Sequence, residues 1–457
     1  MSAPAYESYK DSGVEWLGHV PSHWEINRLK MSISTCKGGI WGDEANNGED
    51  DIICIRVADF SRLDFRITLA APTYRNIASK DRHGRILKRG DLLIEKSGGG
   101  EKQPVGAVAL YDHDVPAVCS NFVARLELMP NMHPAYWTYV HAAAYDRALT
   151  ARCLNQTSGI QNLDLTRYLD ESAPFPPLSE QTAIAAFLDR ETGKIDALIE
   201  AQTRLIELLK EKRQAVISHA VTKGLNPGAP MKDSGIEWLG QVPAHWEVAA
   251  LKRFITILSG YAFPSAGFTT DESDVRLLRG ANIGIGCIRW DDVVYWPEVQ
   301  GLEEFSLAPG DIVLGMDRPW ISGGLRISKL QEGDCPSLLL QRVTRLKPTP
   351  ELDPDYLYSL LVGEAFYHHC APDMTGVSVP HISPSQVEDF RVPIPPESEQ
   401  REIASFITRK SSQYNELIGH AQSAIKHLQE RRAALISAAV TGKIDVRGLV
   451  TIESEAA

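Results

Sequence analysis

Residues 10–30 read KDSGVEWLGHVPSHWEINRLK, and residues 232–252 read KDSGIEWLGQVPAHWEVAALK. Fifteen of the 21 aligned positions are identical, at an offset of 222 residues. A period this long is typical of a duplicated domain, because solenoid repeats are only 20–50 residues long. The sequence therefore predicts two homologous halves of about 220 residues each.

Two further matched segments extend the repeat towards the end of each half. PPLSEQTAIAAFLDR at 176–190 matches PPESEQREIASFITR at 395–409. EKRQAVISHAVT at 211–222 matches ERRAALISAAVT at 430–441, with eight of 12 positions identical. Between these segments the two halves correspond only faintly. A common frame around divergent centres indicates two related tasks with different targets.

Each half ends in a long helical pattern. Ser179 is the predicted N-cap of the first helix, and apolar residues recur at spacings of three, four and seven as far as Ala220. Ser398 begins the second copy. Each stretch is about 43 residues, or ~65 Å, which is too long to bury its apolar stripe against one small domain. We expect the two helices to pair antiparallel in a coiled-coil-like rod, with a solvated spacer hairpin as the alternative.

The divergent centres have the pattern of mixed α and β structure. Short apolar runs separated by long loops predict strands, and one helical segment follows them in each half. The predicted class is α+β, with two homologous domains related by a pseudo-twofold tandem repeat. The predicted strands are 52–57, 91–95, 105–110 and 122–128 in the first half and 275–279, 311–315, 323–330 and 342–346 in the second, with helices at 134–150 and 354–370. FVARLEL at 122–128 aligns with RVTRLKP, which begins at residue 342.

These patterns predict six segments along the chain. The linker between the halves is rich in Gly and Pro. The predicted segments are a first domain at 1–178, a central helix at 179–222, a linker at 223–230, a second domain at 231–397, a distal helix at 398–441 and a tail at 442–457.

Composition limits the protein classes. The 457 residues are 43% hydrophobic and 23% charged, which is typical of a soluble globular chain. No apolar run is long enough for a membrane helix, and the N-terminus lacks the pattern of a secretory signal. The seven cysteines never form CxxC, which argues against disulfides or zinc and for a cytoplasmic protein.

The charge balance is in conflict with DNA binding at first sight. The net charge is −12, whereas phosphate contacts favour basic surfaces. Residues 52–102, however, contain 11 Lys or Arg and six Asp or Glu, so they predict a local basic surface. Residues 276–345 hold eight basic and nine acidic residues and are not basic overall. Charge alone leaves an ordinary solvated surface as the alternative.

No motif predicts chemistry. The chain has no GxxxxGK[ST] phosphate loop, no HExxH, no GxSxG and no Asn/Asp-Pro-Pro-aromatic motif of an amino-methyltransferase. The sequence therefore favours a protein that recognises a target over an enzyme.

The duplicated motifs KDSGxEWLGxVPxHWE and PPxSEQxxIAxF, with the two helix ends, resemble the specificity (S) subunit of type I restriction-modification systems. The resemblance covers the whole chain. It implies that each divergent centre is a target recognition domain for one half of a split, asymmetric DNA site. It also implies that the helices set the spacer and dock two methyltransferase (M) subunits, alongside restriction (R) subunits. The S chain would bind no cofactor, since S-adenosylmethionine, ATP and Mg belong to the partners, and it would not be an enzyme.

Recognition residues cannot be carried over by motif, so we selected side chains that could contact double-stranded DNA. Basic and amide side chains in loops beside predicted strands suit base edges and phosphates. The selected residues are Arg56, Arg75, Lys96, Lys102 and Gln103 in the first domain and Arg279, Asn282, Arg318 and Arg326 in the second, with the loops 157–163 and 375–382 as further candidates. Two alternatives stay open. One is a coiled-coil scaffold that never touches DNA. The other is an S-like fragment that was fused in evolution to a nuclease or a methylase.

Overall fold

The computed structural model describes residues 4–100, 103–157, 160–374 and 380–449. The chain forms two compact units. Unit 1 comprises residues 1–203 with 422–457, and unit 2 comprises residues 204–421. Two long helices, α4 (Leu178–Lys223) and α8 (Glu397–Val440), contribute one part to each unit. The units therefore differ from the predicted segments, because each domain shares its apolar core with the helix ends that pack on it.

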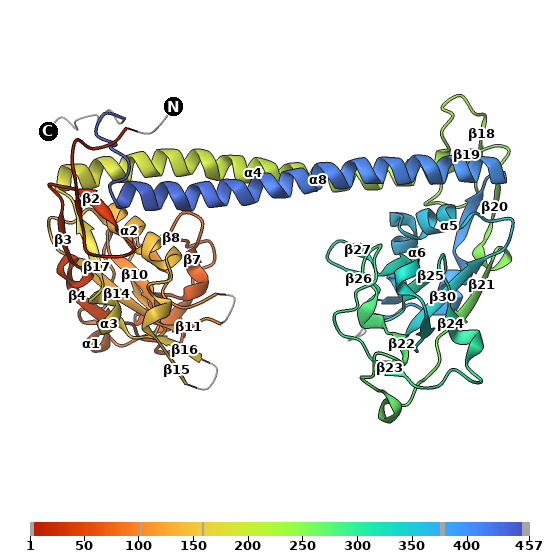
Figure 1. Cartoon of the computed structure of the whole chain (residues 1–457), viewed down its shortest axis with the longest axis horizontal. Helices are drawn as coiled ribbons and strands as arrows, with labels where there is room; N and C mark the ends of the chain where they lie inside the picture. Colours follow the sequence, from red (N-terminus) through yellow and green to blue (C-terminus); the bar gives the residue numbers. More distant parts are fainter. Residues whose placement is uncertain (1–3, 101–102, 158–159, 375–379, 450–457) are drawn as a thin grey trace. The chain divides into compact units, whose positions relative to one another are not determined.

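Unit 1 contains the strands coloured red to orange and is built from mixed sheets (Figure 1). Its largest sheet has the order β4 (Ile33–Gly38), β14 (Val123–Leu128), β10 (Leu92–Glu95), β12 (Val108–Leu110), β8 (Arg66–Ile67) and β7 (Phe60–Ser61). A second sheet has the order β13 (Ala117–Cys119), β6 (Asp51–Ile55), β9 (Tyr74–Asn76) and β5 (Asp43–Glu44), and a third has the order β11 (Ser97–Gly98), β16 (Ile160–Leu163) and β15 (Leu154–Thr157). Paired short strands are β1 (Tyr9–Asp11) with β2 (His19–Pro21) and β3 (Glu25–Arg28) with β17 (Ser172–Phe175). The helices are α1 (Ser79–Arg82), α2 (Pro134–Asp146) and α3 (Leu165–Leu169).

Unit 2 repeats this plan with fewer strands in the main sheet (Figure 1). The main sheet has the order β21 (Ile255–Ser259), β30 (Val343–Pro348), β25 (Ile312–Gly315) and β28 (Ile327–Lys329), and a second has the order β23 (Tyr295–Trp296), β22 (Val275–Leu278), β29 (Ser337–Leu339) and β24 (Ser306–Leu307). Paired short strands are β18 (Met231–Asp233) with β19 (Gln241–Pro243), β20 (Glu247–Ala250) with β31 (Arg391–Ile394), and β26 (Trp320–Ile321) with β27 (Gly324–Leu325). The helices are α5 (Pro354–Leu361), α6 (Glu364–Met374) and α7 (Pro384–Asp389).

The α+β class and the tandem repeat are confirmed by these two plans. In both units a central antiparallel pair, β10 with β14 or β25 with β30, carries the main sheet. In both units two strands of the second sheet pair in parallel, β6 with β13 and β22 with β29. Two expected elements are wrong in detail. The strand at 323–330 is divided into β27 and β28, and the helix at 354–370 is interrupted between α5 and α6, where Gly363 disfavours helix.

A buried carboxylate joins the two duplicated motifs in unit 1. Glu180, at the start of α4, accepts hydrogen bonds from the indole Nε1 of Trp24 at 3.0 Å and the hydroxyl of Tyr6 at 3.0 Å. The imidazole Nε2 of His23 lies 2.6 Å from the other carboxylate oxygen. Trp24 is fully buried. The His-Trp-Glu motif and the Ser-Glu-Gln motif are therefore two parts of one contact.

Unit 2 repeats the contact with its own residues. Glu399 accepts from the Nε1 of Trp246 at 3.0 Å and lies 2.8 Å from the Nε2 of His245. The glutamine that follows also acts alike in both units. Gln181 accepts from the backbone N–H of His133, before α2, and Gln400 accepts from that of Asp353, before α5. The start of each long helix is thereby fixed to its own domain.

Each unit also contains parts of both long helices in antiparallel contact. In unit 1, Ile184 and Leu188 of α4 share an apolar core with Ile436 and Val440 of α8. In unit 2 the opposite ends meet, because Ile217 and Val221 share a core with Ile403 and Ile407. The chain beyond α8 then packs on the first strands of unit 1, where the Nζ of Lys443 donates to the carbonyl of Leu17.

Candidate nucleic-acid interface

The loops at one end of the β25–β30 pair in unit 2 bring several cations around one carboxylate. We call Asp317, Arg318, Arg326, Arg342 and His381 the Asp317 cluster. The guanidinium Nη1 of Arg342 lies 3.1 Å from both carboxylate oxygens of Asp317. The Nδ1 of His381 lies 2.8 Å from one of them. Arg342 is largely exposed, with 63% of its side chain accessible, so this site faces solvent.

Arg326 is the inner cation of this cluster. Its Nε donates to the carbonyl of Ile283 at 3.1 Å, and its Nη1 donates to the carbonyl of Asp317 at 3.2 Å. Burial lowers the pKa of Arg326, and the nearby guanidinium groups of Arg289 and Arg318 lower it further. The cations therefore outweigh the single carboxylate and produce a positive local potential, as an anionic ligand requires.

The other two predicted residues of unit 2 have contacts inside the domain. Asn282 is 2% exposed, and its side-chain N–H groups donate to the carbonyls of Arg289 and Asp292. Arg279 pairs with the carboxylate of Asp292 at 2.9 Å. Both side chains thus hold the loop between η6 (Gly280–Asn282) and β23. Their DNA contact stays a prediction, and their geometry gives them a structural role.

In unit 1 the corresponding region is a partly apolar hollow of about 490 Å³, which we call the Trp41 pocket. Trp41 and Phe122 are large side chains with 37% and 46% exposure at its edge. Glu95 lies in the wall and pairs with Arg62 at 3.0 Å. Burial raises the pKa of Glu95, whereas Arg62 lowers it. Flat aromatic faces beside polar groups suit contact with nucleobases or their methyl groups.

Two predicted arginines of unit 1 lie around this pocket. Arg56 lines it and pairs with Asp59 at 3.0 Å. The Arg75 guanidinium lies 4.5 Å from the ring centroid of Trp41 and donates to the carbonyls of Trp41 and Gly42. Arg75 therefore supports the aromatic edge of the pocket, and a direct contact with DNA remains a prediction for both residues.

The remaining predicted residues of unit 1 differ in position. Lys96 follows β10, is half-buried and forms no ion pair with any carboxylate in the described ranges. Gln103 is exposed and pairs through its backbone with Gly100. Lys102 lies outside the described residues, as do 158–159 of the loop 157–163 and 375–379 of the loop 375–382.

The basic surface expected at 52–102 has fewer unpaired cations than the 11 Lys and Arg in this segment predict. Arg75 and Arg85 donate to backbone carbonyls. Six more cations pair with carboxylates, of which Asp50, Asp112 and Glu127 lie outside residues 52–102. These pairs are Arg56 with Asp59, Arg62 with Glu95, Arg66 and Arg89 with Asp112, Arg82 with Asp50, and Lys88 with Glu127.

Selection by residue type missed several residues of these two surfaces. Trp41 and Phe122 in unit 1 and Asp317 and Arg342 in unit 2 were not selected, whereas His381 lies in the candidate loop 375–382. One signal was available, since the aligned segments FVARLEL and RVTRLKP place Phe122 opposite Arg342. A change from aromatic to basic at the same place in the repeat marks the divergent surface.

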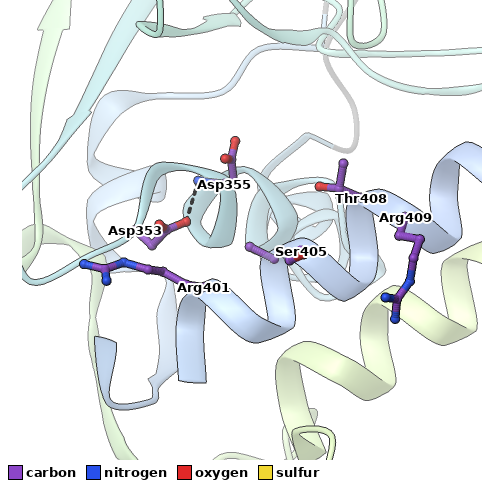
Figure 2. Close-up of a pocket in the computed structure, with 7 residues that line it drawn as sticks. Asp353, Asp355, Arg401, Ser405, Thr408 and Arg409 are labelled. Atoms are coloured by element: carbon purple, nitrogen blue, oxygen red, sulfur yellow. Dashed lines mark hydrogen bonds between the residues drawn. The ribbon is translucent and has the colours of Figure 1, made fainter. Parts of the chain in front are cut away.

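A separate hollow of about 520 Å³ lies in unit 2 beside α5 and α8. Figure 2 shows Asp353 and Asp355 at the start of α5, with Arg401, Ser405, Thr408 and Arg409 along α8. The Asp353 carboxylate accepts the N–H of Asp355 and caps α5. Asp353, which lines the hollow, is thus engaged in capping α5. None of the predicted recognition residues lines this hollow.

The family described as the type I restriction modification DNA specificity domain matches residues 44–210 and again residues 243–427. The chain belongs to this family. The two matches are the two halves of the repeat. They span the Trp41 pocket except for Trp41 itself, and the whole Asp317 cluster. This type I specificity subunit thus has its divergent surfaces at equivalent places in its two domains.

Relatives and solved structures agree with this membership. The MjaVIII specificity subunit of Methanocaldococcus jannaschii is 30% identical over 436 residues, covering 94% of this chain and 95% of that relative. The EcoAI specificity subunit of Escherichia coli is 32% identical over 208 residues, covering 45% of this chain and 35% of that relative. A chain solved in work on complex assembly and conformational transition of the type I R-M system has a TM-score of 0.70 at 16% identity, covering 94% and 99%. The HsdS subunit of Thermoanaerobacter tengcongensis has a TM-score of 0.50 at 16% identity, covering 93% and 98%.

Within the described residues no group of three or more His, Cys, Asp or Glu side chains is arranged to hold a metal ion. No helix in the described part of the chain combines the length and apolarity needed to cross a bilayer.

Proposed function

We propose that this specificity subunit reads a bipartite, asymmetric site in double-stranded DNA, one half with each unit. The observation that carries the proposal is the contrast at one place in the repeat. Phe122 precedes β14 in unit 1, and Arg342 precedes β30 in unit 2. The surrounding fold is the same in both units, including the equivalent hydrogen bonds of Glu180 and Glu399 to a tryptophan. A shared frame with different side chains at one end of the sheet suits two readers of different base sequences.

The long helices support the second part of the proposal, the docking of two M subunits. Leu198 of α4 is 52% exposed in unit 1, and Leu417 of α8 is 49% exposed in unit 2. Exposed leucines on these helices are suitable anchors for a protein partner. R subunits would join the same complex. The repeat makes these surfaces similar, so that two copies of one partner would bind.

The chain would act without chemistry of its own. We propose that S-adenosylmethionine, ATP and Mg are bound by the partner subunits, and that the complex acts in the cytoplasm. The net charge of −12 accords with this division, because a partner can supply phosphate contacts that this chain lacks. A base to be methylated would be extruded from the duplex to reach the partner's site.

The test is a methylation map. The full chain is co-expressed with an M subunit in a host free of DNA methylation, and N6-methyladenine is located by single-molecule sequencing. A motif with two short fixed parts around a fixed gap is the expected result. A stable complex without methylation would favour the scaffold function, and the absence of any complex would contradict the proposed assembly.

A further inference from the structure

Two arginines of the Asp317 cluster have a backbone conformation that side chains disfavour. Arg318 has φ 45° and Arg342 has φ 71°, both in the left-handed region. Gly adopts this region at lower cost because it has no Cβ to crowd the following carbonyl, and Asn does so because its short side chain hydrogen-bonds locally. Both side chains are exposed, so burial of apolar surface does not offset the strain. Strain kept at exposed positions is typical of functional sites.

The two strained turns lie at the same end of one strand pair. β25 and β30 end their pairing at Gly315 and Val343, so the residues beyond both strands are neighbours. The N–H of Met316 donates to the carbonyl of Arg342 at 2.9 Å, and the N–H of Arg318 donates to the carbonyl of Pro380 at 2.7 Å. The backbone therefore holds both side chains at defined positions.

The side chains remain available for a ligand. Asp317 engages only Nη1 of Arg342, which leaves Nε and Nη2 without a partner among the described residues. Arg318 forms no ion pair with a described carboxylate. Asp317 thus orients the guanidinium of Arg342, while the Nε and Nη2 groups of Arg342 remain available to a ligand. A guanidinium held in this way can donate two parallel hydrogen bonds, and O6 and N7 of guanine accept such a pair in the major groove.

We propose that Arg342 and Arg318 are the specificity-determining residues of unit 2 and that they read guanine, with Asp317 as a positioning residue for Arg342. This inference rests on the proposed function of DNA reading. Guanine is favoured over phosphate because a phosphate contact tolerates many orientations and does not require a strained, oriented arginine. Unit 1 has Gly98 and Phe122 at the equivalent places, so the other half-site is read by different chemistry.

The experiment compares methylation maps of the full chain with its M subunit. The variants are Arg342→Lys, which keeps the charge but loses the fork, Arg342→Ala and Arg318→Ala. Lys347→Ala is the matched control, because Lys347 is an exposed cation on β30 away from the cluster. Each Arg variant is expected to relax one guanine in one half-site and to lower methylation of the original site by roughly ten- to a hundredfold. The other half-site and the control should be unchanged.

Two outcomes would overturn the assignment. An unchanged motif, or an equal loss of affinity for all DNA with a smaller salt dependence, would make these arginines bystanders or phosphate contacts. Failure of the wild-type chain to give a bipartite motif would instead contradict the proposed function. Arg342→Gly separates reading from folding, since it should raise the thermal unfolding midpoint while relaxing the motif. A lower midpoint would show that Arg342 holds the fold.

Discussion

The guanidinium of Arg432 in α8 donates two hydrogen bonds to the carboxylate of Asp196 in α4, from Nε to one oxygen at 2.8 Å and from Nη2 to the other at 3.3 Å. The same guanidinium lies 4.8 Å from the ring centroid of Phe65. In unit 2 the repeat-related residues meet as well, where Nη1 of Arg213 donates to Oδ1 of Asn415 at 2.6 Å. The repeat thus extends to single side chains of the helices, with Asp in one unit and Asn in the other.

Asp196→Asn should destabilise unit 1 by about 2 kcal/mol, because it removes the carboxylate that is hydrogen-bonded to the buried guanidinium of Arg432. Asn415→Asp adds the matching charge in unit 2 and should stabilise it by at most about 1 kcal/mol, since this pair is exposed. Denaturant unfolding with a double-mutant cycle of Asp196 and Arg432 measures the coupling. A coupling near zero would show that the pair contributes only packing.

Glu180→Gln should destabilise unit 1 by roughly 2–3 kcal/mol, because bonds to a buried carboxylate are strong and an amide N–H₂ would oppose at least one donor. Glu399→Gln in unit 2 should cost less, since Glu399 is more exposed. Thermal unfolding, monitored by the fluorescence of the nine tryptophans, measures the change in stability. Glu200→Gln, an exposed substitution on the same helix, is the control, and an equal effect there would refute a special role for Glu180.

Unit 1 should lose stability in mild acid through His141. Its ring is fully buried, Nδ1 lies 2.7 Å from the hydroxyl of Tyr168, and Nε2 has no partner in the described structure. Burial lowers the pKa of His141 from 6.5 to about 4. Below pH 6.5 the imidazole of His141 is therefore protonated in the unfolded chain but not in the native state. The free energy of unfolding is not reduced by this group above pH 6.5, and it falls as the pH is lowered towards 4.

The loss through His141 should be on the order of 3 kcal/mol at pH 4. His141→Leu should be less stable at neutral pH, since it leaves the Tyr168 hydroxyl unpaired, but its stability should vary less between pH 6.5 and 4. Urea unfolding at several pH values gives the pH dependence of the unfolding free energy for the variant and for the wild type. Parallel slopes for the variant and the wild type would assign the acid sensitivity to other groups.

Replacement of residues 31–173 by the matching segment of another family member should change only one half of the methylated motif. The reason is that the frame contacts of Trp24 and Glu180 lie outside the exchanged segment. Methylation mapping of the chimaera tests this modularity. A change in both half-sites would mean that the two units do not read independently.

Local pattern was sufficient for the elements of the fold. Helical spacing predicted α4 and α8 closely, since a long amphipathic helix without proline has few competing structures. The predicted N-cap Ser179 was wrong, because α4 begins at Leu178 and Ser179 lies inside it. The buried strand predicted at 91–95 is observed as β10, and its apolar residues are the run 92–94. The interruption at Gly363 and the division into β27 and β28 were not predicted, because short apolar runs are ambiguous.

The recognition surface could not be predicted in the same way. Arg56 and Arg75 were selected as basic side chains in loops, but Arg56 pairs with Asp59 and Arg75 donates to the carbonyls of Trp41 and Gly42. Residue type alone does not reveal these contacts. Asn282 shows the same limit, since its amide binds the carbonyls of residues seven and ten positions further along the chain.

The sequence by itself determined the duplication, the α+β class, the long helices and the family, because repeated motifs and periodicity are properties of order along the chain. Only the tertiary structure decided that the Ser-Glu-Gln and His-Trp motifs are one contact, that most cations of 52–102 are paired, and that Asp317 and Arg342 meet at the end of two strands. The physical reason is that ion pairs, burial and strained turns depend on distances between residues far apart in the chain, which folding alone establishes.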